Sequence, residues 1–298
     1  MNINPARTLS ALAVCLGLAC PAACAGPVLD RIKQTGKIVI GHRDASVPFS
    51  YLDAQRKPVG YAIDLCLKIT EAVRKKLALN SLAVEFVPVT SATRIASVAQ
   101  GSVDLECEST TNNAERRQPV AFTVPHYITG ARYLVRADSR IRELKDFEGK
   151  TLASTVGTTP LKAVNQANQG RLMGIRVIEV PDHVRGVDMV ENGEADGFVM
   201  DEVLLVGLVS GRADPAKLAI VGKYLTIEAL GIMLPKTDPE FKQIADGEMK
   251  RLILSNEAKA LHDRWFMNPI PPNGRSLNLP MNHLLKDFWK YPSDWVPG

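Results

Sequence analysis

The chain has 298 residues, a formal net charge of +4 and 46% hydrophobic residues, enough for one large or two ordinary globular domains. Its 36 basic and 32 acidic residues are interspersed, and no basic stripe with interleaved aromatic residues argues for a nucleic-acid partner. After the N-terminal leader, no segment approaches the roughly 18 consecutive apolar residues that a membrane span needs.

Residues 1–25 have the pattern of a secretory signal peptide. A single basic residue, Arg7, precedes the apolar run 11–19, and small residues stand before Gly26 where cleavage would occur. The pattern predicts export to the periplasm. Cys20 and Cys24 of the leader leave a lipid anchor as the less favoured alternative, because their surroundings do not match the usual lipidation pattern.

The first part of the mature chain alternates strands and helices. Apolar residues at strand and helical spacing predict a strand over 37–41, a loop over 43–48, a hairpin through 51–58, a helix over 61–76 and a strand over 83–89. Strands alternating with helices favour an α/β architecture with a mainly parallel sheet covered on both faces.

A weak internal repeat indicates two comparable halves. Residues 95–105 and 187–198 share one plan, in which a helical pattern ends at a glycine and an aspartate then leads into a strand. Further strands are predicted over 151–154, 175–180 and 197–200. The chain is therefore expected to form two α/β lobes.

Two strand-like crossovers, over 126–130 and 221–229, are expected to join these lobes and to allow hinge bending. The predicted division places residues 26–127 and 229–298 in lobe 1 and residues 128–228 in lobe 2.

The segment 106–116 ends an apolar strand with a run of hydroxyl-bearing residues followed by Arg116. A guanidinium grips a carboxylate through two parallel hydrogen bonds, and hydroxyls and backbone N–H groups at a strand-to-helix junction can supply the rest. The run is thus a candidate carboxylate site. Helix capping is the alternative, because Ser and Thr favour the first position of any helix.

Other polar residues follow the predicted strands in the same way. Ligands of open α/β sheets bind beyond the carboxyl ends of the strands, so these residues form one candidate set, although each could instead be a helix cap or a solvated surface residue. The set comprises Arg43, Ser91, Arg94, Ser109, Thr111, Arg116, Thr159, His183 and Asp201.

Several of these segments resemble the periplasmic glutamate/aspartate-binding proteins of ABC importers, over about residues 29–272. The most specific is the Ser-Thr-Thr-Asn-Asn-x-Glu-Arg run at 109–116, and the others lie at 41–43, 47–51, 90–95, 157–159, 182–183, 200–201 and 268–272. The resemblance implies the type II periplasmic-binding-protein fold, with two lobes that close on an amino acid like a Venus flytrap and then dock on the membrane subunits of an ABC permease.

The resemblance also implies a role for each residue. Arg116 would bind the α-carboxylate of the ligand with Thr111 and Thr159, and Asp201 with Ser109 would bind the α-ammonium. The far end, where a second carboxylate would be held, would be formed by Arg43, Ser91, Arg94 and His183. Charge-assisted hydrogen bonds favour glutamate or aspartate there, because an acidic side chain buried without such partners is costly.

Glu108 departs from the family pattern, which has glycine at this position. If strand alternation holds, Glu108 points away from the face shared by Ser109 and Cys107, and its charge stays outside the pocket. If it turns inward instead, it can pair with Arg43 or Arg94 and shift the preference toward glutamine or asparagine.

Cys66 and Cys107 are the only cysteines after the leader. They could form a disulfide in an oxidising compartment or remain two buried thiols, since sequence does not fix their separation.

An enzyme is the rival class, because the same kind of fold also hosts hydro-lyases that act on small carboxylates. His183 would then be the candidate acid/base, as its unperturbed pKa lies near neutrality. No nucleophile elbow, metal-spaced histidine pair or phosphate loop occurs. The sequence favours a monomeric binding protein with no cofactor.

Overall fold

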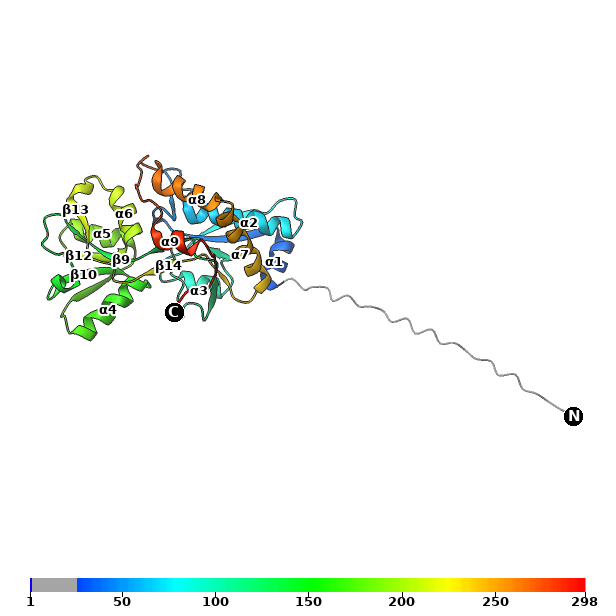
Figure 1. The fold of residues 1–298 in the computed structure, drawn as a ribbon, viewed down its shortest axis with the longest axis horizontal. Coiled ribbons are helices and arrows are strands. Elements are labelled where there is room, and N and C mark those ends of the chain that lie inside the picture. Colours follow the sequence, from blue (N-terminus) through cyan, green and yellow to red (C-terminus); the bar gives the residue numbers. More distant parts are fainter. Residues whose placement is uncertain (2–25, 298) are drawn as a thin grey trace.

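The computed structural model describes Met1 and residues 26–297, so the predicted signal peptide lies, apart from Met1, outside the described residues. Figure 1 shows two lobes side by side, one green to yellow and the other built from both ends of the described chain. Two α/β lobes joined by two crossovers were predicted, and this fold class is confirmed.

The sheet of the first lobe has five strands in the order β5-β1-β6-β15-β7. Neighbouring strands β5, β1 and β6 are parallel, and β15 runs antiparallel to both β6 and β7. The strands are β5 (Ala83–Pro88), β1 (Lys37–His42), β6 (Leu105–Glu106), β15 (Met233–Pro235) and β7 (Val120–Phe122).

The sheet of the second lobe repeats this plan, in the order β11-β10-β12-β9-β13. Again three neighbours are parallel and the fourth strand, β9, is antiparallel to those beside it. The strands are β11 (Arg176–Val180), β10 (Thr151–Thr155), β12 (Gly197–Asp201), β9 (Ala131–Arg136) and β13 (Leu218–Val221). The repeated segments of the sequence lead into β6 and β12, which are the middle strands of the two sheets.

The chain passes between the lobes along β8 (Tyr127–Thr129) and returns along β14 (Glu228–Leu230), and these two strands pair antiparallel. They correspond to the predicted crossovers. The exact lobe boundaries given above stay a prediction. A separate three-stranded sheet contains the predicted hairpin and consists of β2 (Ala45–Ser46), β3 (Ser50–Leu52) and β4 (Pro58–Val59).

Helices cover the sheets of both lobes (Figure 1). Helix α2 spans Tyr61–Lys76, as its apolar spacing predicted, and buries Leu65, Ile69 and Val73 on one side. The other α-helices are α1 (Pro27–Thr35), α3 (Arg94–Ala99), α4 (Thr159–Arg171), α5 (His183–Glu191), α6 (Glu202–Ser210), α7 (Pro239–Leu254), α8 (Glu257–His262) and α9 (His283–Phe288). Short 3-10 turns lie at Leu144–Phe147 and Pro215–Lys217, and a π-helical turn lies at Asp263–Met267.

The C-terminal segment packs against the first crossover. Trp289 donates a hydrogen bond from its indole nitrogen to the carbonyl of Pro125 (3.2 Å), and the side chain of Asn282 donates to the carbonyl of Ile128 in β8 (2.6 Å). These two hydrogen bonds attach the C-terminal segment to the part of the chain that leaves the first lobe.

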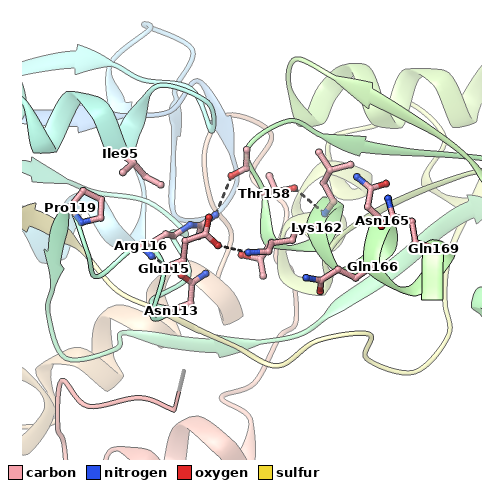
Figure 2. A pocket seen from close by; sticks show the side chains of 13 residues that line it. Ile95, Asn113, Glu115, Arg116, Pro119, Thr158, Lys162, Asn165, Gln166 and Gln169 are labelled. Carbon is pink, nitrogen blue, oxygen red and sulfur yellow. Dashed lines mark hydrogen bonds and ion pairs between the residues drawn. The ribbon is translucent and has the colours of Figure 1, made fainter. Parts of the chain in front are cut away.

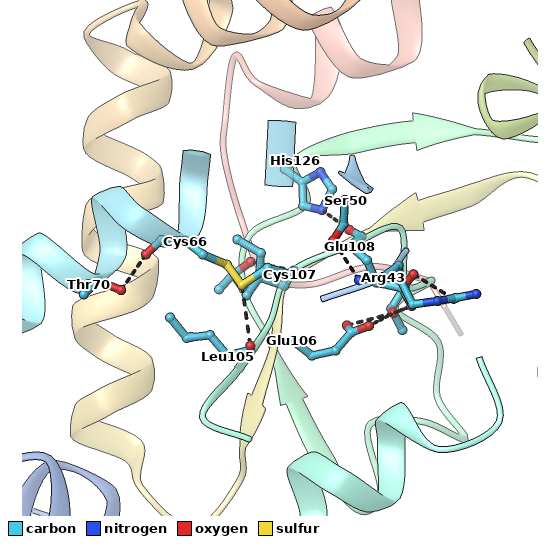
Figure 3. The surroundings of a disulfide bond; sticks show 12 residues. Arg43, Ser50, Cys66, Thr70, Leu105, Glu106, Cys107, Glu108 and His126 are labelled. Carbon is cyan, nitrogen blue, oxygen red and sulfur yellow. Dashed lines mark hydrogen bonds and ion pairs between the residues drawn. A yellow bond between two sulfur atoms is a disulfide. The ribbon is translucent and has the colours of Figure 1, made fainter. Parts of the chain in front are cut away.

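Cys66 of α2 and Cys107, just after β6, form a disulfide with a Cα–Cα distance of 6.2 Å (Figure 3). Both sulfur-bearing side chains are buried. The bond ties the segment after β6, which belongs to the candidate carboxylate site, to a helix of the first lobe.

Reduction of this disulfide should destabilise the protein by roughly 2–5 kcal/mol, because the bond constrains a long loop of the unfolded chain. Urea unfolding with and without a thiol reductant measures the loss. The Cys66→Ser/Cys107→Ser double variant is the control, since reductant should leave its unfolding curve unchanged. An identical unfolding free energy for the oxidised and reduced wild-type protein would contradict this expectation.

Candidate functional site

The candidate residues lie where the strands of both sheets end. Arg43 follows β1, Ser91 and Arg94 follow β5, and Ser109 and Thr111 follow β6. From the second lobe come Thr159 and His183, the first residues of α4 and α5, and Asp201, the last residue of β12. All nine predicted residues are thereby brought to the interface between the lobes.

A small cavity of about 10 Å³ lies between these strand ends. Seven of the predicted residues line it: Ser91, Arg94, Ser109, Thr111, Thr159, His183 and Asp201. Arg43 and Arg116 stand directly behind the lining. Arg43 donates a hydrogen bond to the Ser91 hydroxyl (2.8 Å), and Arg116 donates to the backbone carbonyl of Thr111 (3.0 Å).

Glu108 turns toward the arginines of the site, although it does not itself line the cavity. Its carboxylate accepts a hydrogen bond from Arg43 (Nη1 to Oε2, 3.0 Å) and pairs with Arg94 through its other oxygen. Alternation continues past β6, because Thr110 donates to both Glu106 and Glu108 while Cys107 points the other way, to α2. The pairing with both arginines is the alternative arrangement that the sequence left open.

The neighbouring carboxyl group, Glu106, is held in the opposite protonation state. Burial opposes ionisation of Glu108, but the charges of Arg43 and Arg94 more than offset it and hold its pKa well below the usual range. Burial and the charge of Glu108 raise the pKa of Glu106 well above its usual range. Thr110 links the pair by donating to Glu106 (2.8 Å) while it accepts from Arg94 (2.7 Å).

Asp201 has an oxygen aimed into the site without a partner. Its side chain is buried, and its Oδ1 atom makes no hydrogen bond to any described residue. Although Asp201 stands at the start of α6, its side chain does not cap that helix. Burial and the charge of Glu228 raise its pKa well above the usual range, against the opposing charges of Arg94 and Arg116. A cationic partner would stabilise the ionised form of a buried carboxyl group whose pKa is raised in this way.

Glu228 was missed by the sequence analysis, which treated its segment only as a crossover. It begins β14, lines the cavity, and accepts hydrogen bonds from the hydroxyls of Thr111 and Thr226. The signal in the sequence that could have identified Glu228 was an acidic residue in a strand whose other residues are apolar. Together, Asp201 and Glu228 make one end of the cavity acidic.

His183 lines the cavity as a neutral ring. Burial, with the nearby charge of Arg43, lowers its pKa to about 3. Its Nδ1 atom is 2.8 Å from the hydroxyl of Thr155, which fixes the orientation of the ring. An uncharged imidazole in this setting suits hydrogen bonding to a ligand better than acid catalysis at neutral pH.

Capping accounts for only some of the hydroxyl and amide side chains. Thr158 caps α4 by accepting from the backbone of Leu161 (3.4 Å), and Asn113 accepts from the backbone of Arg116 (2.9 Å). No helix begins in the described segment between β6 and β7, so the contact of Asn113 closes a turn, and Ser109 and Thr111 lie in the cavity wall.

The two lobes touch across the cavity. Arg116 donates from Nη2 to the carbonyl of Gly157 (3.1 Å), and Thr159 donates to Thr111 (3.2 Å). Glu115 and Lys162 form an ion pair farther out, in the crevice that Figure 2 shows. These contacts describe a closed arrangement, in which burial and the charge of Arg94 lower the pKa of Arg116 to about 10.

Within residues 26–297 no helix is both long and apolar enough to cross a bilayer. Nor do the described residues contain a cluster of three or more His, Cys, Asp or Glu side chains that could hold a metal ion.

Comparison with known proteins identifies the family. Residues 38–268 match the family described as bacterial extracellular solute-binding proteins, family 3. The chain belongs to this family. It is therefore a solute-binding protein rather than an enzyme.

Two curated relatives of this solute-binding protein span nearly its whole length. It is 40% identical over 294 residues to the glutamate/aspartate import solute-binding protein of Escherichia coli K12, covering 98% of this chain and 97% of the relative. It is 41% identical over 267 residues to the L-glutamate/L-aspartate-binding protein of Pseudomonas aeruginosa, covering 89% and 88%. A crystal structure of a mutant of ArgBP from T. maritima superposes with a TM-score of 0.72 at 25% identity, covering 80% and 98%.

Replacing Gly157 with alanine should hold the lobes apart. Gly157 has a φ of +76°, and a Cβ atom there would lie 2.5 Å from the backbone oxygen of Ser91 in the other lobe. Small-angle X-ray scattering should give a larger radius of gyration for Gly157→Ala than for the wild-type protein under conditions in which the wild type is closed.

Gly174→Ala is the matched control, because Gly174 has a similar φ of +64° with nothing within 4 Å of the added atom. It should scatter like the wild-type protein. Equal radii for Gly157→Ala and Gly174→Ala would show that the contact at Gly157 does not limit closure.

Proposed function

We propose that this solute-binding protein captures a free α-amino acid between its lobes in the periplasm and delivers it to the membrane subunits of an ABC importer. The observation that carries the proposal is the polarity of the interlobe cavity. Asp201 and Glu228 supply an acidic end, while Arg94 lines the wall and Arg116 stands behind Thr111. Groups of opposite charge on one small cavity match the two charges of a zwitterion.

The proposed roles keep the assignment made from the sequence. Arg116, with the Thr111 and Thr159 hydroxyls, would bind the α-carboxylate. Asp201, with Ser109, would bind the α-ammonium, and the free Oδ1 atom of Asp201 supports this role. Arg43, Ser91, Arg94 and His183 would surround the side chain of the ligand.

The names of the curated relatives support glutamate or aspartate as the ligand. The leader pattern of residues 1–25 supports delivery to the periplasm. An acidic ligand bound in this way would have to share Arg43 and Arg94 with the charge of Glu108, and the pairing of Glu108 therefore favours a neutral amino acid as a second candidate.

A ligand of this class should raise the thermal stability of the purified protein. At about 100 times its dissociation constant, an amino acid that binds only the folded state adds roughly 2.7 kcal/mol. Melting temperatures measured with each of the twenty L-amino acids test this expectation. Unchanged melting with all twenty would refute an amino-acid-binding function.

Arg116→Ala and Asp201→Asn should each abolish binding of whichever amino acid binds the wild-type protein, because both changes remove a partner for an end that every amino acid shares. Calorimetric titration measures the loss. Arg117→Ala is the control, since Arg117 pairs with Asn112 (2.8 Å) and does not line the cavity. Retained affinity in Arg116→Ala and Asp201→Asn would rule out the assigned roles.

A further inference from the structure

The carboxylate of Glu108 already pairs with the two arginines that are proposed to surround the side chain of a ligand. Glu108 is 0% exposed, and each of its side-chain oxygens contacts a different guanidinium group, Oε2 that of Arg43 and Oε1 that of Arg94. Two arginines at the ends of neighbouring strands thus already share a carboxylate that belongs to the protein.

Each arginine reaches its partners through a single nitrogen. Arg43 uses the same nitrogen to contact Ser91 (2.8 Å) and Glu108 (3.0 Å), and Arg94 uses one nitrogen for Glu108 and Thr110, while its buried Nε atom has no partner among the described residues. An acidic ligand side chain would have to approach the remaining nitrogens of these guanidinium groups, beside the charge of Glu108. Like charges brought together in a buried site repel strongly, because the local dielectric is low.

The backbone at Glu108 is also held in place (Figure 3). Its preceding residue, Cys107, is bonded to Cys66 of α2, and its carbonyl accepts a hydrogen bond from Nε2 of His126 (3.1 Å). Moving Glu108 out of the cluster would strip two buried guanidinium groups of their partner, which is strongly destabilising.

The balance of charge in the site agrees with this geometry. Around the cavity, the guanidinium groups of Arg43, Arg94 and Arg116 face the carboxyl groups of Glu108, Asp201 and Glu228. Once a bound ammonium group favours the ionised form of Asp201, these three carboxylates match the three guanidinium groups without a ligand side chain. A zwitterion with a neutral side chain preserves this balance, whereas glutamate or aspartate would add an uncompensated buried negative charge.

We infer that Glu108 is a built-in substitute for the side-chain carboxylate of a ligand, so that the site selects α-amino acids with an uncharged side chain and rejects glutamate and aspartate. This inference rests on the proposed amino-acid-binding function and narrows the class of amino acids that can be its ligand. Glu108 stays ionised at neutral pH because the charges of Arg43 and Arg94 lower its pKa by more than burial raises it.

The test is calorimetric titration of the wild-type protein and Glu108→Gly with all twenty L-amino acids at neutral pH. The wild-type protein should bind at least one uncharged amino acid at least tenfold more tightly than glutamate or aspartate. In Glu108→Gly, the affinity for glutamate or aspartate relative to that amino acid should rise at least tenfold, because the ligand can then supply the missing carboxylate.

Two further variants keep the test decisive. Glu106→Gln is the control, because Glu106 is buried beside Glu108 but contacts neither arginine; it should keep the wild-type preference. Glu108→Gln preserves the size of the side chain and removes its charge, and it should weaken the discrimination against acidic ligands even if Glu108→Gly does not fold.

The results distinguish failure of the inference about Glu108 from failure of the proposed amino-acid-binding function. If the wild-type protein prefers any charged amino acid, or if neither Glu108 variant shifts the preference, the inference about Glu108 is overturned while the amino-acid-binding function stands. If no amino acid binds the wild-type protein or either Glu108 variant, the proposed function itself fails.

Discussion

The site depends on the need to match buried charges across a cavity that excludes most water. Three guanidinium groups and several carboxyl groups converge on one small space, and each would be costly to bury alone. Arg43 and Arg94 are matched by Glu108 within one lobe. Arg116 and Asp201, which come from different lobes, are the charges left to be matched by a zwitterion, and this links binding to closure.

The fold makes this matching possible. Both sheets follow the same order of strands, so their carboxyl ends, with the polar residues that follow them, face each other when the lobes meet. The lobes are joined by β8 and β14, and Glu228 of β14 reaches the cavity from this connection. A change in the relative position of the lobes therefore moves an acidic side chain relative to the ligand. Closure of the lobes can thus depend on whether a ligand is bound in the cavity.

Much of this arrangement could be predicted from sequence. Helix α2 was given its observed bounds because its apolar residues recur at helical spacing, and seven of the nine candidate residues line the cavity because strand ends share one edge of a sheet. The pairing of Glu108 with Arg43 and Arg94 could not be predicted, since alternation does not tell which side of the segment meets two residues that are distant in the sequence. Glu228 was missed because its strand has no polar motif and its position depends on pairing with β8.

A crystal structure of the complex with the tightest-binding amino acid would test this view of the site most directly. The ligand's ammonium group should lie on Asp201 and its α-carboxylate on Arg116, while Glu108 remains between Arg43 and Arg94. A ligand carboxylate bound to Arg43 or Arg94, with the Glu108 side chain displaced, would contradict it.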